Sequence, residues 1–298
     1  MASDESHRKR VGVATAPSVT TLVAAPGAEA ALRACVDGIK ATSDWLGPGA
    51  CDITGADEAA WRAAIDRQPI DVIVQPAEGR RKRLLVADLE STIIENEMLE
   101  ELADFLGLRA HVAEITRRAM NGEIDFIGAL TERVALLRGM PAGVLDEAAR
   151  RIRLMPGART LIATLRRAGV KTALVSGGFT VFAERVAAEL CFDRVVANQL
   201  DIAAGKLAGT VSPPIVTGTT KRETLLVLAS EYGLSLAETM AVGDGANDLS
   251  MLGAAGLGVA FRAKPTVAAV AHWCIDHADL TALLYAQGYR REDFIAGG

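Results

Sequence analysis

Short apolar runs alternate with longer amphipathic runs along most of this chain of 298 residues. From Leu84 onward the alternation predicts successive βαβ units, and therefore an α/β fold with a mostly parallel, Rossmann-like sheet and helices on both of its faces. Such sheets bind ligands at the carboxyl ends of their strands. A β-hairpin over Leu200–Val211 is expected to extend the sheet. The expected strands are Leu84–Asp88, Lys171–Ser176, Arg194–Ala197, Thr239–Asp244 and Leu257–Ala260.

The stretch between the first two strands is far longer than one crossover helix needs, and its apolar residues recur with helical spacing. We therefore expect an inserted helical cap at about residues 97–153. Its expected helices are Glu97–Leu106, Val112–Met120, Phe126–Leu137 and Val144–Ile152.

The first part of the chain has a different pattern, which predicts a small α/β module with its linker at residues 1–80, ahead of a main domain at 81–298. Basic residues in Pro76–Arg83 favour a solvated linker. Binding of nucleic acid by this run is the alternative, but no aromatic residue or second basic cluster supports it. The elements expected in the module are strands Val19–Ala24 and Ile70–Val74 and helices Ala28–Lys40 and Glu58–Ile65.

The composition excludes several classes of protein. Hydrophobic residues make up 50% of the chain and charged residues 23%, which is typical of a globular enzyme and excludes a largely disordered chain. A net charge of −5 argues against a nucleic-acid partner. An acidic protein that binds an anion needs a metal ion or a local group of basic side chains.

Residues near the amino terminus resemble a signal peptide only in part. Val11–Ala28 is uncharged, but it contains prolines and glycines, and Asp4 and Glu5 stand where positive charges are needed. The stretch is also too polar to span a membrane. The four cysteines are scattered, so we expect them to be buried and reduced. These features predict a cytoplasmic protein with no membrane partner.

Chemically capable residues stand where the first two strands of the main domain end. Asp88 and Glu90 follow the first strand, and residues two apart can turn toward one cleft as nucleophile and general acid/base. A solvated loop or a helix cap is the alternative. Ser176–Gly178 follows the second strand, directly before a helix expected from Phe179, where free N–H groups suit a phosphate. A tight turn is the alternative there.

The strand Thr239–Asp244 leads into a segment that begins like a dinucleotide-binding G-x-G-x-x-G motif. Asp248 stands in place of the third glycine and would repel a pyrophosphate, so this interpretation is disfavoured. Asp244, Asn247 and Asp248 together suit a hard cation such as Mg²⁺. Lys221 is expected to start a helix, where it is unfavourable for the dipole, which indicates a role other than helix stability.

In this order, the four motifs closely resemble those of the haloacid dehalogenase superfamily of phosphatases and, within it, of the phosphoserine phosphatase family. The resemblance extends over about residues 84–284 and includes the cap. It implies that Asp88 is the nucleophile that becomes an aspartyl-phosphate, and that Glu90 protonates the leaving oxygen and then activates water. It also implies that Mg²⁺ is bound by Asp88, the backbone carbonyl of Glu90 and Asp244, with Asp248 supporting these ligands.

The resemblance assigns the phosphate-binding residues as well. Ser176 and the N–H of Gly177 would hold phosphate oxygens, Lys221 would neutralise the phosphoryl charge, and Asn247 would contact the substrate.

Selectivity for the substrate would come from the cap. Glu97 would bind the serine ammonium, and the fork of Arg133 would bind the carboxylate. Met120 and Phe126 would exclude water. Without the resemblance, Met120 and Phe126 would be interpreted as cap core and Arg133 as part of a solvated helix face.

The implied reaction is Mg²⁺-dependent hydrolysis of O-phospho-L-serine to L-serine and phosphate, the last step of serine biosynthesis. Glu90 departs from the Asp that the family usually has. A relative that transfers phosphate from phosphoserine to homoserine also has Glu, so transfer to a small alcohol is the alternative. A non-catalytic sensor of phosphoserine or serine is a second one. The N-terminal module faintly resembles the small ACT-like domains that sense amino acids, and a homodimer is a further hypothesis.

Overall fold

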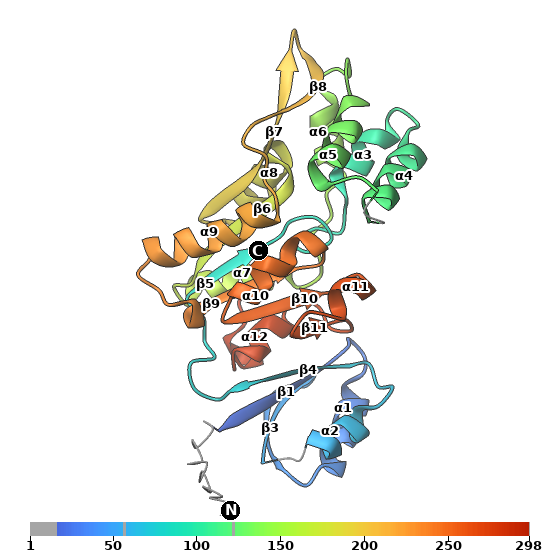
Figure 1. Ribbon diagram of the computed structural model, residues 1–298. Coiled ribbons are helices and arrows are strands. Elements are labelled where there is room, and N and C mark those ends of the chain that lie inside the picture. The colour runs from blue at the N-terminus through green and yellow to red at the C-terminus, as the bar shows by residue number, and fades with distance from the viewer. Residues whose placement is uncertain (1–16, 56–57, 121–122, 298) are drawn as a thin grey trace, which may run out of the picture.

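A seven-stranded sheet forms the centre of the molecule in the computed structural model, which describes residues 17–55, 58–120 and 123–297 (Figure 1). Its strand order is β11-β10-β9-β5-β6-β7-β8, and every pair is parallel except β7 with β8. The expected mostly parallel sheet is therefore confirmed. The strands are β5 Leu84–Ala87, β6 Lys171–Phe179, β7 Arg194–Ala203, β8 Lys206–Ser212, β9 Thr239–Gly243, β10 Leu257–Phe261 and β11 Trp273–Ile275.

Helices cover both faces of this sheet because its strands are apolar on both sides. In the fully buried strand β5, Leu84 and Val86 pack with helices of one face, while Leu85 and Ala87 pack with helices of the other. The first face carries α9 Gly218–Glu231, α10 Leu249–Ala254 and α11 Pro265–Ala268, and the second carries α7 Ala158–Arg167, α8 Thr180–Leu190 and α12 Ala282–Ala286.

A helical cap is inserted between β5 and β6, as expected, and stands above the carboxyl ends of the strands (Figure 1). The chain enters and leaves it side by side, since Ile94 and Leu154 form an antiparallel bridge and the N–H of Glu95 donates to the carbonyl of Arg153 at 2.8 Å. Its helices are α3 Met98–Asp104, α4 Arg109–Met120, α5 Phe126–Ala135 and α6 Val144–Ala149.

Strand β7 differs from its prediction. One strand runs from Arg194 to Ala203 and pairs with β8, where a separate short strand and hairpin were expected. The turn between them has positive φ angles at Ala204 (50°) and Gly205 (72°), the backbone of a tight hairpin turn. The hairpin also reaches the cap, because the N–H of Gly139 donates to the carbonyl of Leu207 at 2.8 Å.

The N-terminal module is a four-stranded antiparallel sheet of order β2-β3-β1-β4 with two helices. Its βαββαβ succession is the ferredoxin-like arrangement and agrees with the expected ACT-like module. The sequence pattern missed β2 and β3, since the start of β2 is a solvent-exposed polar run without alternation. The elements are β1 Ser18–Ala24, α1 Glu29–Gly38, β2 Thr42–Gly47, β3 Ala50–Thr54, α2 Glu58–Ile65 and β4 Ile70–Pro76.

Both faces of this small sheet are buried. Leu22 and Ile70 pack into the module's own core with α1, whereas Val23 and Ile73, on the other face, join the main core that contains α12. Figure 1 shows the module packed beneath α12 and β11. The module is thus attached through an apolar face rather than through its linker alone.

The basic run after β4 is solvated only in part: Arg81 and Arg83 are exposed, as expected, but Arg80 and Lys82 are not. Lys82 is buried, and its ammonium donates to the carbonyls of Gly79 (3.0 Å) and Ala237 (2.8 Å). The Arg80 guanidinium forms an ion pair with buried Asp52 at 2.7 Å. Arg80 thus binds this segment to the N-terminal module, and Lys82 binds it to the main domain.

The described residues bear on the expectations for membrane spans and for the cysteines. Within those ranges, none of the helices combines the length and the apolarity needed to cross a bilayer. Cys35 and Cys51 are buried, as expected, but Cys191 is exposed because it ends α8 in a left-handed conformation with φ 62°.

Candidate active site

The carboxyl ends of β5, β6 and β9 open into a cavity of about 710 Å³ beneath the cap. The chain leaves β5 for β6 on one side and returns to β9 on the other, so this is the point where the strand order reverses. The cavity brings together most of the residues expected from the sequence. Those that line it are Asp88, Glu90, Glu97, Phe126, Arg133, Ser176, Gly177, Asp244 and Asn247.

Lys221 lies beneath the cavity and is fully buried between two carboxylates. Its Nζ donates to Oδ1 of Asp88 at 2.6 Å and to Oδ1 of Asp248 at 2.7 Å. The helix that carries it begins at Gly218, so the expectation that Lys221 starts the helix is wrong. Its burial is explained by the two ion pairs, because a buried ammonium requires charged partners.

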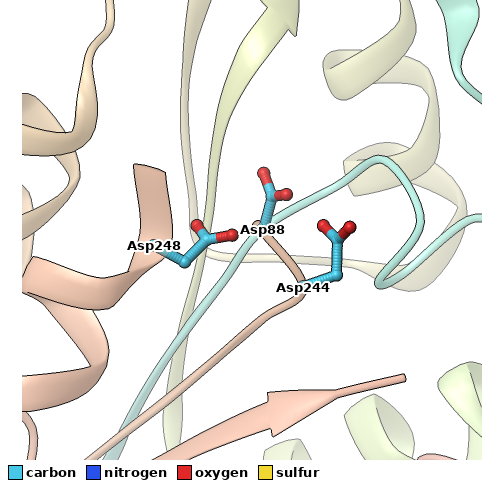
Figure 2. A group of neighbouring side chains, drawn as sticks. All are labelled: Asp88, Asp244 and Asp248. Carbon is cyan, nitrogen blue, oxygen red and sulfur yellow. The ribbon is translucent and has the colours of Figure 1, made fainter. Parts of the chain in front are cut away.

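Three carboxylates form the floor of the site. Oxygens of Asp88, Asp244 and Asp248 all lie within 4.8 Å of one another, and Figure 2 shows the side chains clustered at the ends of their segments. Gly243 is required here, since a Cβ at that position would overlap the carboxylate of Asp248. Hard oxygen donors at this spacing fit a divalent cation such as Mg²⁺. The Asp248 carboxylate, which was expected only to support the ligands, belongs to this cluster as well.

Burial governs the electrostatics of this floor. It raises the pKa of Asp88 to about 8 and that of Asp244 to about 7, and the nearby Asp248 carboxylate adds to both shifts. Burial alone would lower the pKa of Lys221, but Asp88 and Asp248 outweigh it and raise that pKa overall. The carboxyl groups of Asp88 and Asp244 therefore keep their protons near neutral pH unless further positive charge is supplied, and a bound cation would favour their ionised forms.

Glu90 points away from the floor toward the cap. Its Oε1 accepts the N–H of Met98 at 2.8 Å, at the first turn of α3. Burial raises the pKa of Glu90 to about 8, with Glu97 as the next cause. A carboxyl group that keeps its proton near neutral pH is suited to general acid catalysis.

The segment Ser176–Gly178, which we call the phosphate cradle because it was expected to bind phosphate, differs from its prediction in where the strand ends and the helix begins. Strand β6 continues to Phe179 and α8 begins at Thr180, so Ser176 does not lie directly at the helix start. Instead, the pairing with β7 breaks between Val175 and Phe179, and Oγ of Ser176 accepts the N–H of Gly178 at 2.9 Å. The glycines allow close contacts, since a Cβ on Gly177 would lie 3.0 Å from Phe126.

Asn198 is a site-forming residue that the sequence did not reveal. It is buried in β7, donates from Nδ2 to the carbonyl of Gly177 at 2.7 Å, and accepts the N–H of Val216 at 2.8 Å. It thereby ties the cradle to the segment before α9. A polar residue in a buried strand is the only signal that could have indicated it.

The cap contributes charges of both signs to the cavity. The Arg133 guanidinium is held by the carbonyl of Ala129 (3.0 Å) and Oγ1 of Thr116 (3.3 Å). Glu97 is exposed and accepts the hydroxyl of Ser91 at 2.7 Å. The side chain of Met120 lies outside the described residues. Thr116, Lys264 and Thr266 also line the cavity, although no motif in the sequence indicated them.

A match to the haloacid dehalogenase-like hydrolases covers residues 85–253, which include the cap and the sheet strands from β5 to β9. The chain belongs to this family. The resemblance drawn from its strand-end motifs, and the expected hydrolase class, are confirmed.

Two curated relatives show how far the similarity extends. Phosphoserine phosphatase SerB2 of Mycobacterium tuberculosis is 42% identical over 279 residues, which are 90% of this chain and 68% of that protein. The phosphoserine phosphatase of Streptomyces coelicolor is 45% identical over 224 residues, which are 75% of this chain and 55% of that protein. The chain thus spans little more than half the length of the second relative.

Solved structures show the same architecture. A probable phosphoserine phosphatase from Vibrio cholerae in unliganded form aligns with a TM-score of 0.74 at 31% identity, covering 93% of this chain and 88% of that one. A structure described as a phospho-aspartyl intermediate analogue of phosphoserine phosphatase aligns with a TM-score of 0.65 at 38% identity, covering 69% of this chain and 98% of that one.

Proposed function

We propose that this protein hydrolyses O-phospho-L-serine to L-serine and phosphate with the help of Mg²⁺. The observation that carries the proposal is one cavity with Asp88 at its floor, paired with Lys221 beneath it, and with Arg133 and Glu97 lining it from the cap. The names of the relatives support the same substrate. The enclosed floor suits a phosphoryl group, and the two cap charges suit an amino acid.

In the first step, a carboxylate oxygen of Asp88 attacks phosphorus, and the bond from phosphorus to the seryl oxygen breaks. Glu90 gives its proton to the departing oxygen, so serine leaves as an alcohol and an aspartyl-phosphate remains. The similar phosphoserine phosphatase structure with a phospho-aspartyl intermediate analogue supports such a step. Lys221, 2.6 Å from Asp88, offsets the repulsion between carboxylate and phosphate.

In the second step, Glu90 takes a proton from water as the water oxygen attacks phosphorus. The bond from phosphorus to Asp88 breaks, and phosphate and the free carboxylate result. Asp88, Asp244 and the carbonyl of Glu90 would hold Mg²⁺, with Asp248 beside them, and the ion would neutralise charge on the phosphoryl oxygens. Ser176 and the N–H of Gly177 would hold those oxygens, and Asn247 would contact the substrate.

The presence of Glu at position 90 is the reason to test phosphoryl transfer as the alternative reaction. Glu90 accepts a hydrogen bond from the first turn of α3, so it lies between the floor and the cap. Incubation of the full chain with phosphoserine and Mg²⁺, with and without homoserine, separates the two reactions. We expect free phosphate in both tubes. Release of phosphate only with homoserine, or phosphohomoserine as the main product, would contradict the hydrolase proposal.

A third outcome of the same assay would be binding of phosphoserine without turnover, which is the behaviour of a sensor. The place in serine biosynthesis, the cytoplasmic location and a homodimer stay predictions of the sequence.

A further inference from the structure

Asp71 on β4 makes an unusual connection between the N-terminal module and the main sheet. Its carboxylate is 6% exposed and accepts three successive backbone N–H groups of the loop that follows β11. The donors are Asp276 at 2.9 Å, His277 at 3.2 Å and Ala278 at 2.7 Å. Hydrogen bonds to a charged acceptor are roughly twice as strong as neutral ones, so this loop is held firmly.

The same loop is held from the other side by Arg262. The guanidinium of Arg262 donates to the carbonyl of Ala278 at 3.3 Å, and the backbone N–H of Arg262 donates to the carbonyl of Ile275 at 2.7 Å. Ala278 is therefore fixed at its N–H by Asp71 and at its carbonyl by Arg262. Arg262 itself has a φ of 45°, a conformation that persists in a non-glycine residue only when its surroundings enforce it.

The residues directly after Arg262 form one rim of the active-site cavity. Lys264, Thr266 and Val267 line it, and the N–H of Lys264 lies 3.4 Å from the carbonyl oxygen of Asp244. The thiol of Cys274 on β11 contacts the carbonyl of Ala268 at 3.6 Å, at the end of the rim helix α11. Contacts thus run without interruption from Asp71 to the cavity.

We propose that Asp71 is a positioning residue for the active site, and that the N-terminal module sets the place of the rim 262–268 through it. The module then acts as a part of the catalytic unit, and any ligand or partner that shifts β4 would change substrate binding. This inference rests on the cavity and its rim and is independent of which phosphate ester the enzyme uses.

The first test is hydrogen exchange of the full chain with Asp71→Asn. The amide keeps the size of the side chain but turns an NH₂ group toward N–H donors. We expect faster exchange in the loop 276–278 and, as the informative result, at least about fivefold faster exchange in the rim 262–268. Faster exchange confined to the loop would overturn the proposal.

Asp52→Asn is the matched control. Asp52 is also buried on the module, and accepts the hydroxyl of Thr21 at 2.7 Å and the Arg80 guanidinium at 2.7 Å. These partners lie outside the loop after β11, so we expect a loss of thermal stability with unchanged exchange in 262–268. An equal change of rim exchange in both variants would reduce Asp71 to a general role in stability and overturn the proposal.

Steady-state kinetics supply a second measurement, with phosphoserine and with para-nitrophenyl phosphate as substrates. We expect Asp71→Asn to raise KM about fivefold or more while kcat per folded molecule stays within about twofold. A purely structural role would lower the folded fraction and leave KM unchanged. If phosphoserine is no substrate, the proposed function fails, but the exchange result still decides this inference.

Arg262→Gln tests the same connection from the main domain, and serves if Asp71→Asn does not fold. It removes the bond to the carbonyl of Ala278 and leaves the module intact. We expect the same rise in rim exchange and KM, and a double variant no worse than the more affected single one, because both residues hold Ala278. Additive effects of the two substitutions, or an unchanged rim in Arg262→Gln, would contradict the proposal.

Discussion

The ammonium of Lys221 donates hydrogen bonds to both Asp88 and Asp248 at the floor of the site. These two contacts fix the position of the Asp88 side chain. Lys221 contacts one carboxylate oxygen of Asp88, the proposed nucleophile, and leaves the second oxygen available to attack phosphorus. A nucleophile in this position cannot be replaced by its amide, because a neutral amide oxygen is a poor nucleophile and does not form the acyl phosphate that water hydrolyses.

We therefore expect Asp88→Asn to lower kcat at least about a thousandfold, measured as phosphate release. The fold should persist, since the amide still accepts a hydrogen bond from Lys221. Asp37→Asn is the control, because Asp37 is an exposed acid on α1, and it should retain full activity. Full turnover by Asp88→Asn would exclude an aspartyl-phosphate.

Glu90 is the proposed general acid, and it should give the reaction its pH dependence. Because burial raises its pKa to about 8, the protonated acid predominates below that pH and is lost above it. We expect kcat to fall as the pH rises through about 8 if protonation of the leaving oxygen limits the rate. In Glu90→Gln, kcat should drop about 10²–10⁴-fold and this alkaline decline should disappear. An unchanged decline in the variant would assign it to another group.

In the proposed function, Arg133 recognises the carboxylate of the substrate. For Arg133→Ala we expect a loss of about 2–4 kcal/mol in transition-state stabilisation with phosphoserine. The loss should be much smaller with phosphoethanolamine, which lacks the carboxylate. Arg118→Ala, which removes an ion pair with Glu132 elsewhere in the cap, is the control. Equal losses of kcat/KM with both substrates would remove Arg133 from substrate recognition.

The sequence located the residues whose chemistry is visible in a motif and missed those that act by position. Asp88, Glu90 and Asp244 stand beside strand ends, and parallel strands bring their ends to one edge, so their meeting could be predicted. Asn198 and Thr116 hold a loop carbonyl and a guanidinium through contacts between distant segments. Such contacts depend on packing geometry, which periodicity does not contain.

At the scale of elements, the irregular end of β6 brings the phosphate cradle close to Glu90. A Cβ on Gly178 would lie 2.8 Å from Oε2 of Glu90, so any larger residue must displace that carboxylate. We expect Gly178→Ala to lower kcat about a hundredfold while the circular dichroism spectrum is unchanged. Gly253→Ala in α10, where a Cβ meets nothing within 4 Å, should be active. Wild-type activity in Gly178→Ala would show that the carboxylate can move without loss.

Elements with strong apolar patterns were predicted to within a few residues, and elements without such a pattern were not. The central strands β5 and β9 are fully buried, so their apolar runs are unambiguous. Strand β11 has only three residues, two of them partly exposed, and it owes its place to parallel pairing with β10. No local signal distinguishes such a strand from a loop.

The whole molecule buries a group of acidic side chains, and its stability should therefore depend on pH. Asp88, Glu90 and Asp244 have pKa values raised to about 8, 8 and 7. The folded state therefore keeps protons that the unfolded state loses, so without Mg²⁺ stability should decrease as the pH rises from about 5 to about 8. Mg²⁺ competes with those protons, and its benefit should be larger at high pH.

Thermal unfolding in EDTA and in Mg²⁺, at pH 6 and pH 8, measures this dependence. We expect Mg²⁺ to raise Tm at both pH values and more at pH 8. Asp244→Asn should lose most of the Mg²⁺ effect. An equal rise of Tm at both pH values would show that the carboxylates ionise without the metal.

The doubly buried sheet of the N-terminal module has a consequence for the order in which the protein is made. Val23, Leu46, Ala50 and Ile73 emerge early from the ribosome, but they share a core with α12, which is made about two hundred residues later. Throughout that interval an apolar sheet face has no cover, and such faces bind chaperones or aggregate. Synthesis of the chain thus includes a waiting period whose length is set by the distance between β4 and α12.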